Sequence, residues 1–386
     1  MSRKIIFVSY GDSRSTVSWS NIPYLFSENL EKKGFELVRL DINPNPETNL
    51  WWGNYVYRYL SILFPNHYYS YIRTWFFRRE TFQKIKKVVR ENPDAYFCVF
   101  LNFEFYNKFS KVPSLLFGDW TYDIVILDRL NRKPYFFEKW FTKYQRKAIK
   151  NAEIVVSLFK DARDSIAKRY QKDVKHLGIN VINDLNNNPI SDDEVLEAKK
   201  NTHQILFIGT PKYLEGAKKL LSAFKILQKN YSEIQLNIIG IKEDELFEKD
   251  KLAENVNCFG YLKKDNQEDN KTYYNLLSQA KVLVNPSETW AAYSSSIEAM
   301  KYFTPVIIKP YEAFVKDFGT ENDFGYYLEN TEIETIVNAI EKVMFSENYL
   351  ELCKNANARV KDYTWDNYIE KIVELMQEVK ISKSTL

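Results

Sequence analysis

Short apolar runs alternate with longer amphipathic stretches along the chain, and the alternation occurs in both halves of the sequence. Apolar runs of about five residues are typical of strands buried on both faces, whereas apolar residues three and four positions apart indicate helices. Strands alternating with helices predict parallel sheets covered by helices, which is an α/β fold. In the first half we predict strands at 5–9, 35–42, 95–101, 113–117 and 153–158.

Local signals place helices between these strands. The first helix begins near Asn21, with Pro23 in its first turn, and ends at Gly34, since a glycine readily takes the left-handed conformation that closes a helix. Further helices are predicted at 136–150 and 161–170. The first two strands and the helix between them form a βαβ unit of ordinary length.

The second half repeats the pattern after a polar, charged stretch at 183–204. Such a shift in composition marks a domain boundary, so we predict a first domain at 1–182 and a second at 183–362. We predict strands at 205–209, 235–240, 256–261, 282–284 and 305–308, and helices at 216–229, 273–279, 333–345 and 348–359. A helix also begins near Ser294, and a last helix follows Asp366.

Composition narrows the class of protein. A chain of 386 residues, 45% of them hydrophobic, is long enough for two domains with separate cores. Its 54 basic and 51 acidic residues nearly cancel, which argues against binding to nucleic acid through bulk charge. Three widely separated cysteines favour reduced thiols in a cytoplasmic protein. We find no signal-peptide pattern and no apolar run of about 18 residues, so we expect no membrane span.

Residues 51–90 differ from the rest of the chain because aromatic side chains alternate with basic ones. One interpretation is that the aromatic residues form the core face of one or two helices. A second is that they form, with cations such as Arg78 and Arg79, an acceptor cleft or a contact with the membrane surface. Stacking of nucleic-acid bases would use the same residue types, but the balanced charge disfavours it.

The segment at 281–309 carries the clearest chemical pattern. An apolar strand is followed by a polar and aromatic loop, and three serines then lead into a helix that contains Glu298. In parallel sheets, ligands bind at the carboxyl ends of strands, where helix N-termini direct N–H groups at anions. Hydroxyl donors at Ser294, Ser295 and Ser296 and a carboxylate at Glu298 therefore predict a nucleotide-phosphate site. The alternative is that the helix dipole alone favours a glutamate in the first turn.

Three other positions follow predicted strand ends. Lys212 lies in the turn after the strand at 205–209 and could meet a diphosphate, although a lysine in a surface turn needs no function. Asp119 follows the strand at 113–117, where it would either face a cleft or stabilise a turn. The loop with Gly11, Asp12 and Arg14 after the first strand is a further place to hold a phosphate or an acceptor.

Several classes of site lack their sequence signals. His67, His176 and His203 are isolated from other metal-ligating residues, so no metal site is predicted. The sequence has no Gly-x-Ser-x-Gly motif, no P-loop Gly-Lys-Ser/Thr and no GxGxxG after its first strand. These absences count against a serine hydrolase, a P-loop enzyme and a nicotinamide-dependent dehydrogenase.

Five segments of the second half share their residues and spacing with a known enzyme family. They are FIGT with EGAKKLLSAF at 207–224, LNIIG at 236–240, VNCFGYL at 256–262, VLVNPS with IEAMKYFTPVI at 282–307, and YTWDNY at 363–368. In these segments the chain resembles the donor domain of GT-B glycosyltransferases, particularly family 4, and GIN at 178–180 resembles the end of that family's first domain. The first half corresponds only in strand order. The resemblance implies two Rossmann-like domains facing across a cleft, with a last helix at 363–386 crossing back to the first.

The resemblance also implies roles for individual residues. Glu298 corresponds to the second glutamate of the family's paired-glutamate motif, which holds the nucleotide ribose. Gly209 corresponds to the turn that faces the phosphates, and Tyr261 and Leu262 lie in the region that contacts the base. The remaining residues that we assign to the donor site are Tyr293, Ser294, Ser295, Ser296, Thr210 and Lys212.

The chain departs from the family pattern at three positions. Trp290 occupies the place of the first glutamate of the pair, and Glu288 is two residues out of register. Thr210 and Glu215 stand where the family has an arginine and a lysine, so both cationic phosphate ligands are missing from their expected places. The substitutes that we consider are Lys212, Arg14, Lys309, and the three serines with their helix N-terminus.

The resemblance implies a metal-independent glycosyltransferase that needs no cofactor besides its nucleotide-diphosphate sugar. Its acceptor would be a glycan or a lipid-linked molecule in the synthesis of cell-surface polysaccharide or glycoconjugate. We expect it in the cytoplasm, with residues 51–90 as a candidate peripheral contact with the inner face of the membrane. Whether the reaction retains or inverts the anomeric configuration stays open. An inverting enzyme needs a general base, and Asp119 is the candidate.

Two alternatives remain on the sequence alone. Trp290, Thr210 and Glu215 are also compatible with a catalytically weakened GT-B protein that binds nucleotide sugars or serves as a scaffold subunit. An epimerase or a phosphorylase on the same fold is the second alternative. Donor hydrolysis by the isolated chain would distinguish an active enzyme from a scaffold.

Overall fold

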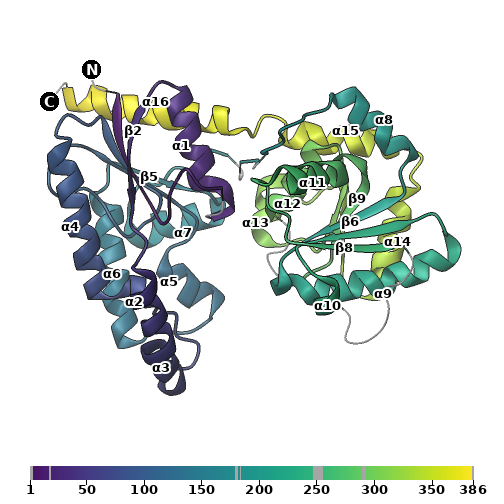
Figure 1. Cartoon of the computed structure of the whole chain (residues 1–386), viewed down its shortest axis with the longest axis horizontal. Helices are drawn as coiled ribbons and strands as arrows, with labels where there is room; N and C mark the ends of the chain where they lie inside the picture. The colour runs from purple at the N-terminus through teal and green to yellow at the C-terminus, as the bar shows by residue number, and fades with distance from the viewer. Residues whose placement is uncertain are drawn as a thin grey trace. The chain divides into compact units, whose positions relative to one another are not determined.

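The chain forms two compact units, each built on one parallel sheet (Figure 1). The computed structural model describes residues 3–16, 19–178, 181–182, 184–246, 255–288 and 293–384. Unit 1 consists of Met1–Asn180 with Trp365–Leu386, and unit 2 consists of Val181–Thr364. Trp290 and the last two residues of the GIN segment, which carry part of the sequence interpretation, lie outside the described residues.

Unit 1 holds a sheet of five strands in the order β2-β1-β3-β4-β5. Its strands are β1 (Lys4–Ser9), β2 (Glu36–Asp41), β3 (Phe97–Phe100), β4 (Ser114–Gly118) and β5 (Ile154–Ser157). Its helices are α1 (Ile22–Lys32), α2 (Pro46–Trp51), α3 (Arg58–Leu63), α4 (Trp75–Glu91), α5 (Tyr122–Ile124), α6 (Phe136–Asn151), α7 (Lys160–Tyr170) and α16 (Trp365–Ser384). There are 3-10 turns at Trp19–Asn21 and Tyr71–Arg73, and π-helical segments at Trp52–Tyr57 and Val125–Arg129. The predicted strands of the first half are confirmed, with ends shifted by one or two residues.

The sequence pattern explains this sheet. Strands β3, β4 and β5 are apolar and buried along their whole length, because helices cover both faces of a parallel sheet. All strand pairs are parallel, and the strand order changes direction between β1 and β3. The carboxyl ends of strands open a crevice at such a point, which is where ligands bind in sheets of this type.

Helix α16, the last of the chain, packs on α1 within unit 1 (Figure 1). The rings of Trp365 and Phe26 lie 6.0 Å apart, and the Nζ of Lys33 lies 2.9 Å from a carboxylate oxygen of Asp366. Burial of the aromatic ring supplies most of the stabilisation, because an exposed ion pair contributes little.

Unit 2 holds a sheet of six parallel strands in the order β11-β10-β9-β6-β7-β8. Its strands are β6 (Gln204–Ile208), β7 (Gln235–Ile239), β8 (Val256–Gly260), β9 (Ala280–Asn285), β10 (Val306–Ile308) and β11 (Gly325–Tyr327). Its helices are α8 (Asp192–Asn201), α9 (Leu214–Asn230), α10 (Glu243–Leu246), α11 (Gln267–Gln279), α12 (Tyr293–Lys301), α13 (Glu312–Phe318), α14 (Ile333–Met344) and α15 (Tyr349–Val360). The strand order reverses between β6 and β9, which predicts a ligand crevice at their carboxyl ends.

Two groups of helices cover this sheet (Figure 1). Helices α9, α10 and α14 form one group, and α8, α11, α12 and α15 form the other. Residues of α9 and α14 pack with β6, β7 and β9 in one hydrophobic core. This packing fixes the first turn of α9 against the strand ends where the crevice is expected.

Four elements of unit 2 were not predicted from the sequence: α8, α10, α13 and β11. Helix α8 lies inside the polar stretch that suggested a domain boundary. Its start is a capping box in which Ser191 Oγ accepts from the N–H of Glu194, and the carboxylate of Glu194 accepts from the N–H of Ser191 at 2.9 Å. The capping signal was present in the sequence, but the scarcity of apolar residues concealed the helix.

The aromatic residues at 51–90 do not form one core face, so that interpretation is wrong for much of the stretch. Phe77 and Phe82 are buried, but Trp51, Tyr55 and Phe76 are more than half exposed. Among the described residues, no helix combines the length and apolarity required to cross a membrane.

Candidate functional site

The carboxyl ends of β6 and β9 lie side by side at the point where the strand order of unit 2 reverses, which is where a ligand crevice is expected. The Nδ2 of Asn285, the last residue of β9, donates to the carbonyl of Ile208, the last residue of β6, at 3.3 Å. Asn285 is completely buried, and its Oδ1 also accepts from the hydroxyl of Ser287 at 2.7 Å. This side chain therefore joins the two strand ends and orients the loop that follows β9.

Glycine is required at two places around this crevice. Gly240 has a positive φ of 92°, and a Cβ added there would lie 2.4 Å from the carbonyl oxygen of Gly209. A Cβ on Gly216, in the first turn of α9, would lie 2.3 Å from the Oγ of Ser287. The backbone of the turn after β6 and the start of α9 thus approach their neighbours more closely than another residue type allows.

Glu298 is a buried carboxylate on α12, and two residues from other elements bind it through an ion pair and a hydrogen bond. It is only 4% exposed. Lys264, in the loop after β8, forms an ion pair with its Oε1, and the hydroxyl of Tyr273 on α11 donates to its Oε2 at 2.8 Å. Each carboxylate oxygen can accept a further hydrogen bond, so a pair of sugar hydroxyls could still be recognised. Burial of Tyr273, reinforced by the negative charge of Glu298, raises the pKa of the phenol well above its ordinary value.

The predicted serines occupy the first turn of α12. Ser296 is completely buried, and its Oγ has no hydrogen-bond partner among the described residues. Ser294 and Ser295 are half-buried. Tyr293 is buried, and its hydroxyl donates to the carboxylate of Asp317. A buried hydroxyl without a partner is costly, which makes Ser296 a candidate to bind a ligand oxygen.

The sequence did not single out two cations that lie near the strand ends of unit 2. Lys264, described above, is one. The other is Lys219 on α9, whose Nζ lies 3.3 Å from Glu288 Oε1 and also donates to the hydroxyl of Thr331. Lys219 follows Glu215 by one helical turn, so it lies on the same face of α9 as the position where the family has its lysine. Only this helical spacing could have identified Lys219 in advance.

The other predicted donor-site residues are mostly exposed. Thr210 and Lys212 are exposed in the turn after β6, and the Nζ of Lys212 lies 5.4 Å from the ring centroid of Tyr213. Tyr261 is 68% exposed, and Leu262 is half-buried in the loop after β8. The structure places these four residues at carboxyl strand ends but gives them no contact with Glu298. The Nζ of Lys309 donates to the carbonyl of Glu329.

Unit 1 contains a cavity of about 570 Å³ at the carboxyl ends of β1, β3 and β4. Tyr10 follows β1, Glu104 follows β3, Asp119 follows β4, and all three line the cavity with Arg73 and Trp120. Aromatic faces beside carboxyl groups suit a polyhydroxylated molecule such as a sugar, because carboxylates accept hydroxyl protons and rings pack against C–H groups.

Both carboxyl groups of this cavity bind protons more tightly than usual. Burial raises the pKa of Asp119, while the N–H of Trp120, which donates to Oδ1 at 2.8 Å, acts in the opposite direction. Burial also raises the pKa of Glu104; the charge of Arg73 opposes this and the charge of Asp119 adds to it. The two carboxyls therefore influence each other, as expected of an acid–base site.

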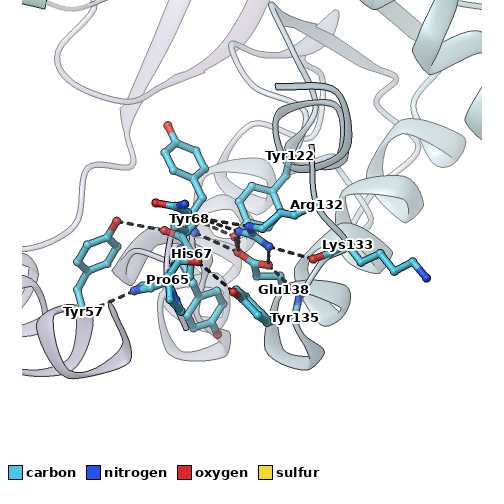
Figure 2. Close-up of polar contacts among 11 residues, drawn as sticks. Tyr57, Pro65, His67, Tyr68, Tyr122, Arg132, Lys133, Tyr135 and Glu138 are labelled. Atoms are coloured by element: carbon cyan, nitrogen blue, oxygen red, sulfur yellow. Dashed lines mark hydrogen bonds and ion pairs between the residues drawn. The ribbon is translucent and has the colours of Figure 1, made fainter. Parts of the chain in front are cut away.

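A hydrogen-bond network surrounds Glu138 (Figure 2), and two of its residues, Tyr68 and Tyr122, line this cavity. Glu138 is completely buried, and its carboxylate accepts from both Nη atoms of Arg132 at 2.7 and 2.8 Å and from the N–H groups of Tyr68 and Tyr135. Burial acts to raise the pKa of Glu138, but these hydrogen bonds outweigh it and lower the pKa. The hydroxyl of Tyr122 donates to the same carboxylate at 3.1 Å, so the network holds two aromatic residues that line the cavity.

Three predicted residues of the loop after β1 do not line this cavity, although Tyr10 of the same loop does. The N–H of Gly11 donates to Asp41 at 2.8 Å, and Arg14 pairs with Asp12 at 4.0 Å with both side chains largely exposed. Gly11, Asp12 and Arg14 are not among the residues that line the cavity. Within the described ranges, no three His, Cys, Asp or Glu side chains gather in a group that could hold a metal ion.

Comparison with known proteins finds a family model that matches the second half of the chain. The model of the family described as "Glycosyl transferases group 1" matches residues 190–363. A poly(glycerol-phosphate) alpha-glucosyltransferase of Bacillus subtilis is 24% identical over 201 residues, which are 50% of this chain and 29% of that protein. The chain spans less than half the length of each of two curated relatives that it matches.

Solved structures share the fold over nearly the whole chain. A glycosyltransferase from Rickettsia africae has a TM-score of 0.65 at 14% identity, with 98% of each chain covered. The Anabaena protein HepE, crystallised with UDP and glucose, has a TM-score of 0.57 at 13% identity, with 99% of each chain covered. The two parallel sheets described above are thus those of the GT-B fold, and residues 190–363 match the model of the glycosyl transferases group 1 family.

Proposed function

We propose that the protein transfers a sugar from a nucleotide-diphosphate sugar to an acceptor, with the donor bound at the carboxyl edge of the unit 2 sheet. The observation that carries the proposal is the buried Glu298, held by Lys264 and Tyr273 in a family-matched domain. Glu298 would accept the ribose hydroxyls, and the turn at Gly209 with the first turn of α12 would receive the diphosphate. The complex of HepE with UDP and glucose supports a nucleotide sugar as the donor class.

Positive charge for the departing diphosphate would come from the chain itself. Arginine and lysine are absent from positions 210 and 215, but Lys219 and Lys264 lie at strand ends of the same sheet. Cationic side chains and backbone N–H groups can stabilise a leaving phosphate without a metal ion. We therefore expect transfer to proceed at an unchanged rate after treatment with EDTA.

The acceptor would bind in the cavity of unit 1, with Asp119 as the general base in an inverting reaction. Its raised pKa gives the carboxylate a greater affinity for a hydroxyl proton than an ordinary aspartate has. Asp119→Asn should lower kcat by about a hundredfold or more, whereas Glu104→Gln should have a smaller effect. Equal losses of kcat in Asp119→Asn and Glu104→Gln would show that Asp119 is not the general base.

The acceptor class that we propose is a glycan or a lipid-linked molecule used for surface polysaccharide or glycoconjugate. The poly(glycerol-phosphate) relative supports a polymeric acceptor. For a lipid-linked acceptor, the exposed apolar side chains of α2 and α3, among them Trp51, Ile62 and Leu63, would contact the membrane surface. Replacing these three residues with serine should reduce co-sedimentation of the protein with liposomes. Unchanged co-sedimentation would show that this surface does not contact the membrane.

The test of the function is release of nucleoside diphosphate from a panel of nucleotide sugars. Thr210 and Glu215 stand where the family has an arginine and a lysine. These two departures favour a second candidate function, a scaffold subunit that binds nucleotide sugars without turning them over. Measurable release by the isolated chain supports the enzyme and excludes the scaffold. Donor binding without release, even with a range of acceptors, supports the scaffold, and absence of both binding and release contradicts each of them.

A further inference from the structure

A second hollow in unit 1 has an unusual distribution of charge. It is a groove of about 360 Å³ between α4, α6 and the loop after β3. Five of its lining residues are cations, Arg78, Arg79, Lys86, Lys108 and Lys147, and none of the lining residues is acidic. The remaining lining is mostly aromatic. We call this hollow the basic groove.

The helical period produces this surface. The groove residues of α4 recur at intervals of three and four positions, so they form one stripe along the helix. Tyr144 and Lys147 are three positions apart on α6 and face the same hollow. Glu80 of α4 lies outside the stripe and pairs with Lys84, which also does not line the groove.

The cations of the basic groove form no ion pairs with acidic side chains among the described residues. None of the five forms an ion pair in the part of the chain that the structure describes, whereas many other cations of unit 1, such as Arg39, Arg132 and Arg169, do. Arg78 is only 8% exposed. Its Nη1 donates to the neutral carbonyl of Glu104 at 3.0 Å, and none of its five N–H donors is bonded to a carboxylate among the described residues.

Holding these positive charges in the groove costs free energy, because burial disfavours a charged group and the cations repel one another. Burial lowers the pKa of Arg78 to about 10. Burial also lowers the pKa of Lys108, and the charges of Arg78 and Lys147 add to that effect. Cation–π contacts offset part of this cost. The Cζ of Arg78 lies 4.4 Å from the ring centroid of Tyr144, and the Nζ of Lys108 lies 3.9 Å from that of Phe82. Cations that repel one another in a groove without acids are stabilised by an anionic ligand.

We infer that the basic groove binds the phosphate groups of a phosphomonoester or diphosphate. Arginine forks and lysine ammonium groups bind phosphate oxygens together, and aromatic walls accept an apolar segment attached to the phosphate. All residues that line the groove belong to unit 1, whereas the proposed donor site consists of residues of unit 2, so the two sites share no residue. A ligand bound in the basic groove would affect the proposed acceptor cavity of unit 1. Arg78 of the groove donates to the backbone carbonyl of Glu104, and Glu104 lines that cavity.

This inference does not depend on the proposed transfer reaction. The probe is inorganic pyrophosphate, titrated calorimetrically into the full chain. The groove variant is Lys86→Gln with Lys147→Gln. Its control is Lys87→Gln with Lys150→Gln, which removes the same charge from the same two helices at exposed positions that do not line the groove. Neither pair of lysines belongs to unit 2, so a difference between the two variants reports the groove even where pyrophosphate also binds at the donor edge.

We expect the groove variant to bind pyrophosphate about tenfold more weakly than the control, and the control to stay within about twofold of the wild type. Vesicles of phosphatidylcholine with phosphatidic acid form a second arm. If the groove variant binds vesicles more weakly than the control but binds pyrophosphate equally well, the source of the phosphate is a lipid headgroup. A difference with pyrophosphate alone identifies a soluble phosphate. Equal behaviour of the two pairs in both arms overturns the inference.

Discussion

Lys264 and Glu298 form an ion pair that joins the loop after β8 to helix α12, 34 residues further along the chain. Both side chains are largely withdrawn from water, with 13% and 6% of their side-chain surfaces exposed. A buried ion pair is weak evidence for stability, because desolvation offsets the attraction between the charges. Under the proposed function, its position at the carboxyl edge of the sheet is that of a preset pair, a carboxylate for the ribose hydroxyls and a cation beside it.

The first prediction concerns this pair. Lys264→Met should destabilise the protein by about 3 kcal/mol, because it leaves the Glu298 carboxylate buried without its cation. Adding Glu298→Gln should restore part of the loss, with a coupling energy of about 1–3 kcal/mol in a double-mutant cycle measured by denaturant unfolding. Lys263→Met, at the exposed neighbouring position, should stay within about 0.5 kcal/mol of the wild type. Additive effects of the two substitutions would show that the ion pair carries no energy.

The second prediction concerns Glu104 and pH. Because its pKa is raised in the folded state, the folded chain keeps the proton to higher pH than the unfolded chain does. Stability therefore falls as pH rises from the ordinary glutamate value of 4.5 to the raised pKa, and the penalty stays constant above it. Glu104→Gln removes the penalty and can keep the hydrogen bond from Gln145, which is 3.2 Å long in the wild type.

Thermal unfolding measures this effect. The Tm of Glu104→Gln should exceed that of the wild type near pH 8, and the two should converge near pH 4. A wild type that is the more stable of the two near pH 8 would mean that the ionised Glu104 is well paired, which contradicts the raised pKa.

The third prediction concerns the close approach of Gly240 to Gly209. Gly240→Ala combines the cost of a positive φ, about 1–2 kcal/mol, with a clash against a backbone carbonyl. Gly34 is the matched control because its φ is also positive, at 83°, but a Cβ there meets only the flexible end of Arg3. We expect Gly240→Ala to lose more stability than Gly34→Ala and also to weaken nucleotide binding, since the turn at Gly209 must shift. Equal losses of stability with unchanged binding would show that this contact does not shape the site.

The fourth prediction concerns Lys199, which is completely buried in unit 2. Its Nζ donates to the carbonyls of Leu277 and Ala280 and to the hydroxyl of Thr304, at 2.7–2.8 Å. Lys199→Met removes the donor for these buried acceptors and should cost about 2–4 kcal/mol. Lys200→Met, which changes an exposed side chain, should cost less than about 0.5 kcal/mol.

The effect of Lys199 should also depend on pH. Burial lowers its pKa from 10.5 to about 7, so between these values the unfolded chain binds a proton that the folded chain does not. The stability of the wild type should rise across this window relative to Lys199→Met. A constant difference from neutral to alkaline pH would mean that the buried ammonium keeps its proton.

The sequence predicted much of the fold because its signals are local. Apolar runs marked most of the strands, and Asn21, Pro23 and Gly34 marked the ends of α1. The misses are elements whose burial depends on contacts distant in sequence. Helix α13 has seven residues and strand β11 three, so each is too short to show a clear period in the sequence, and β11 is held by its pairing with β10 at the edge of the sheet.

The candidate site was predictable only in part. Glu298 and the serines at 294–296 follow a strand end, which is a local pattern. Lys264 was missed because nothing in a loop lysine indicates that it reaches a carboxylate on another helix. Lys219 was missed because the expected lysine position holds Glu215, and the replacement lies one turn later. The aromatic stretch was misjudged because helical spacing does not show which face a neighbouring element covers.

The central claim, a nucleotide-diphosphate site that includes Glu298, is tested most directly by isothermal titration with a panel of nucleoside diphosphates. The comparison needs the wild type, Glu298→Gln, and the control Glu334→Gln, which changes an exposed glutamate in the first turn of α14. We predict that at least one nucleoside diphosphate binds the wild type and the control equally, and binds Glu298→Gln about tenfold or more weakly. Absence of binding to the wild type, or equal binding to all three proteins, would contradict the account.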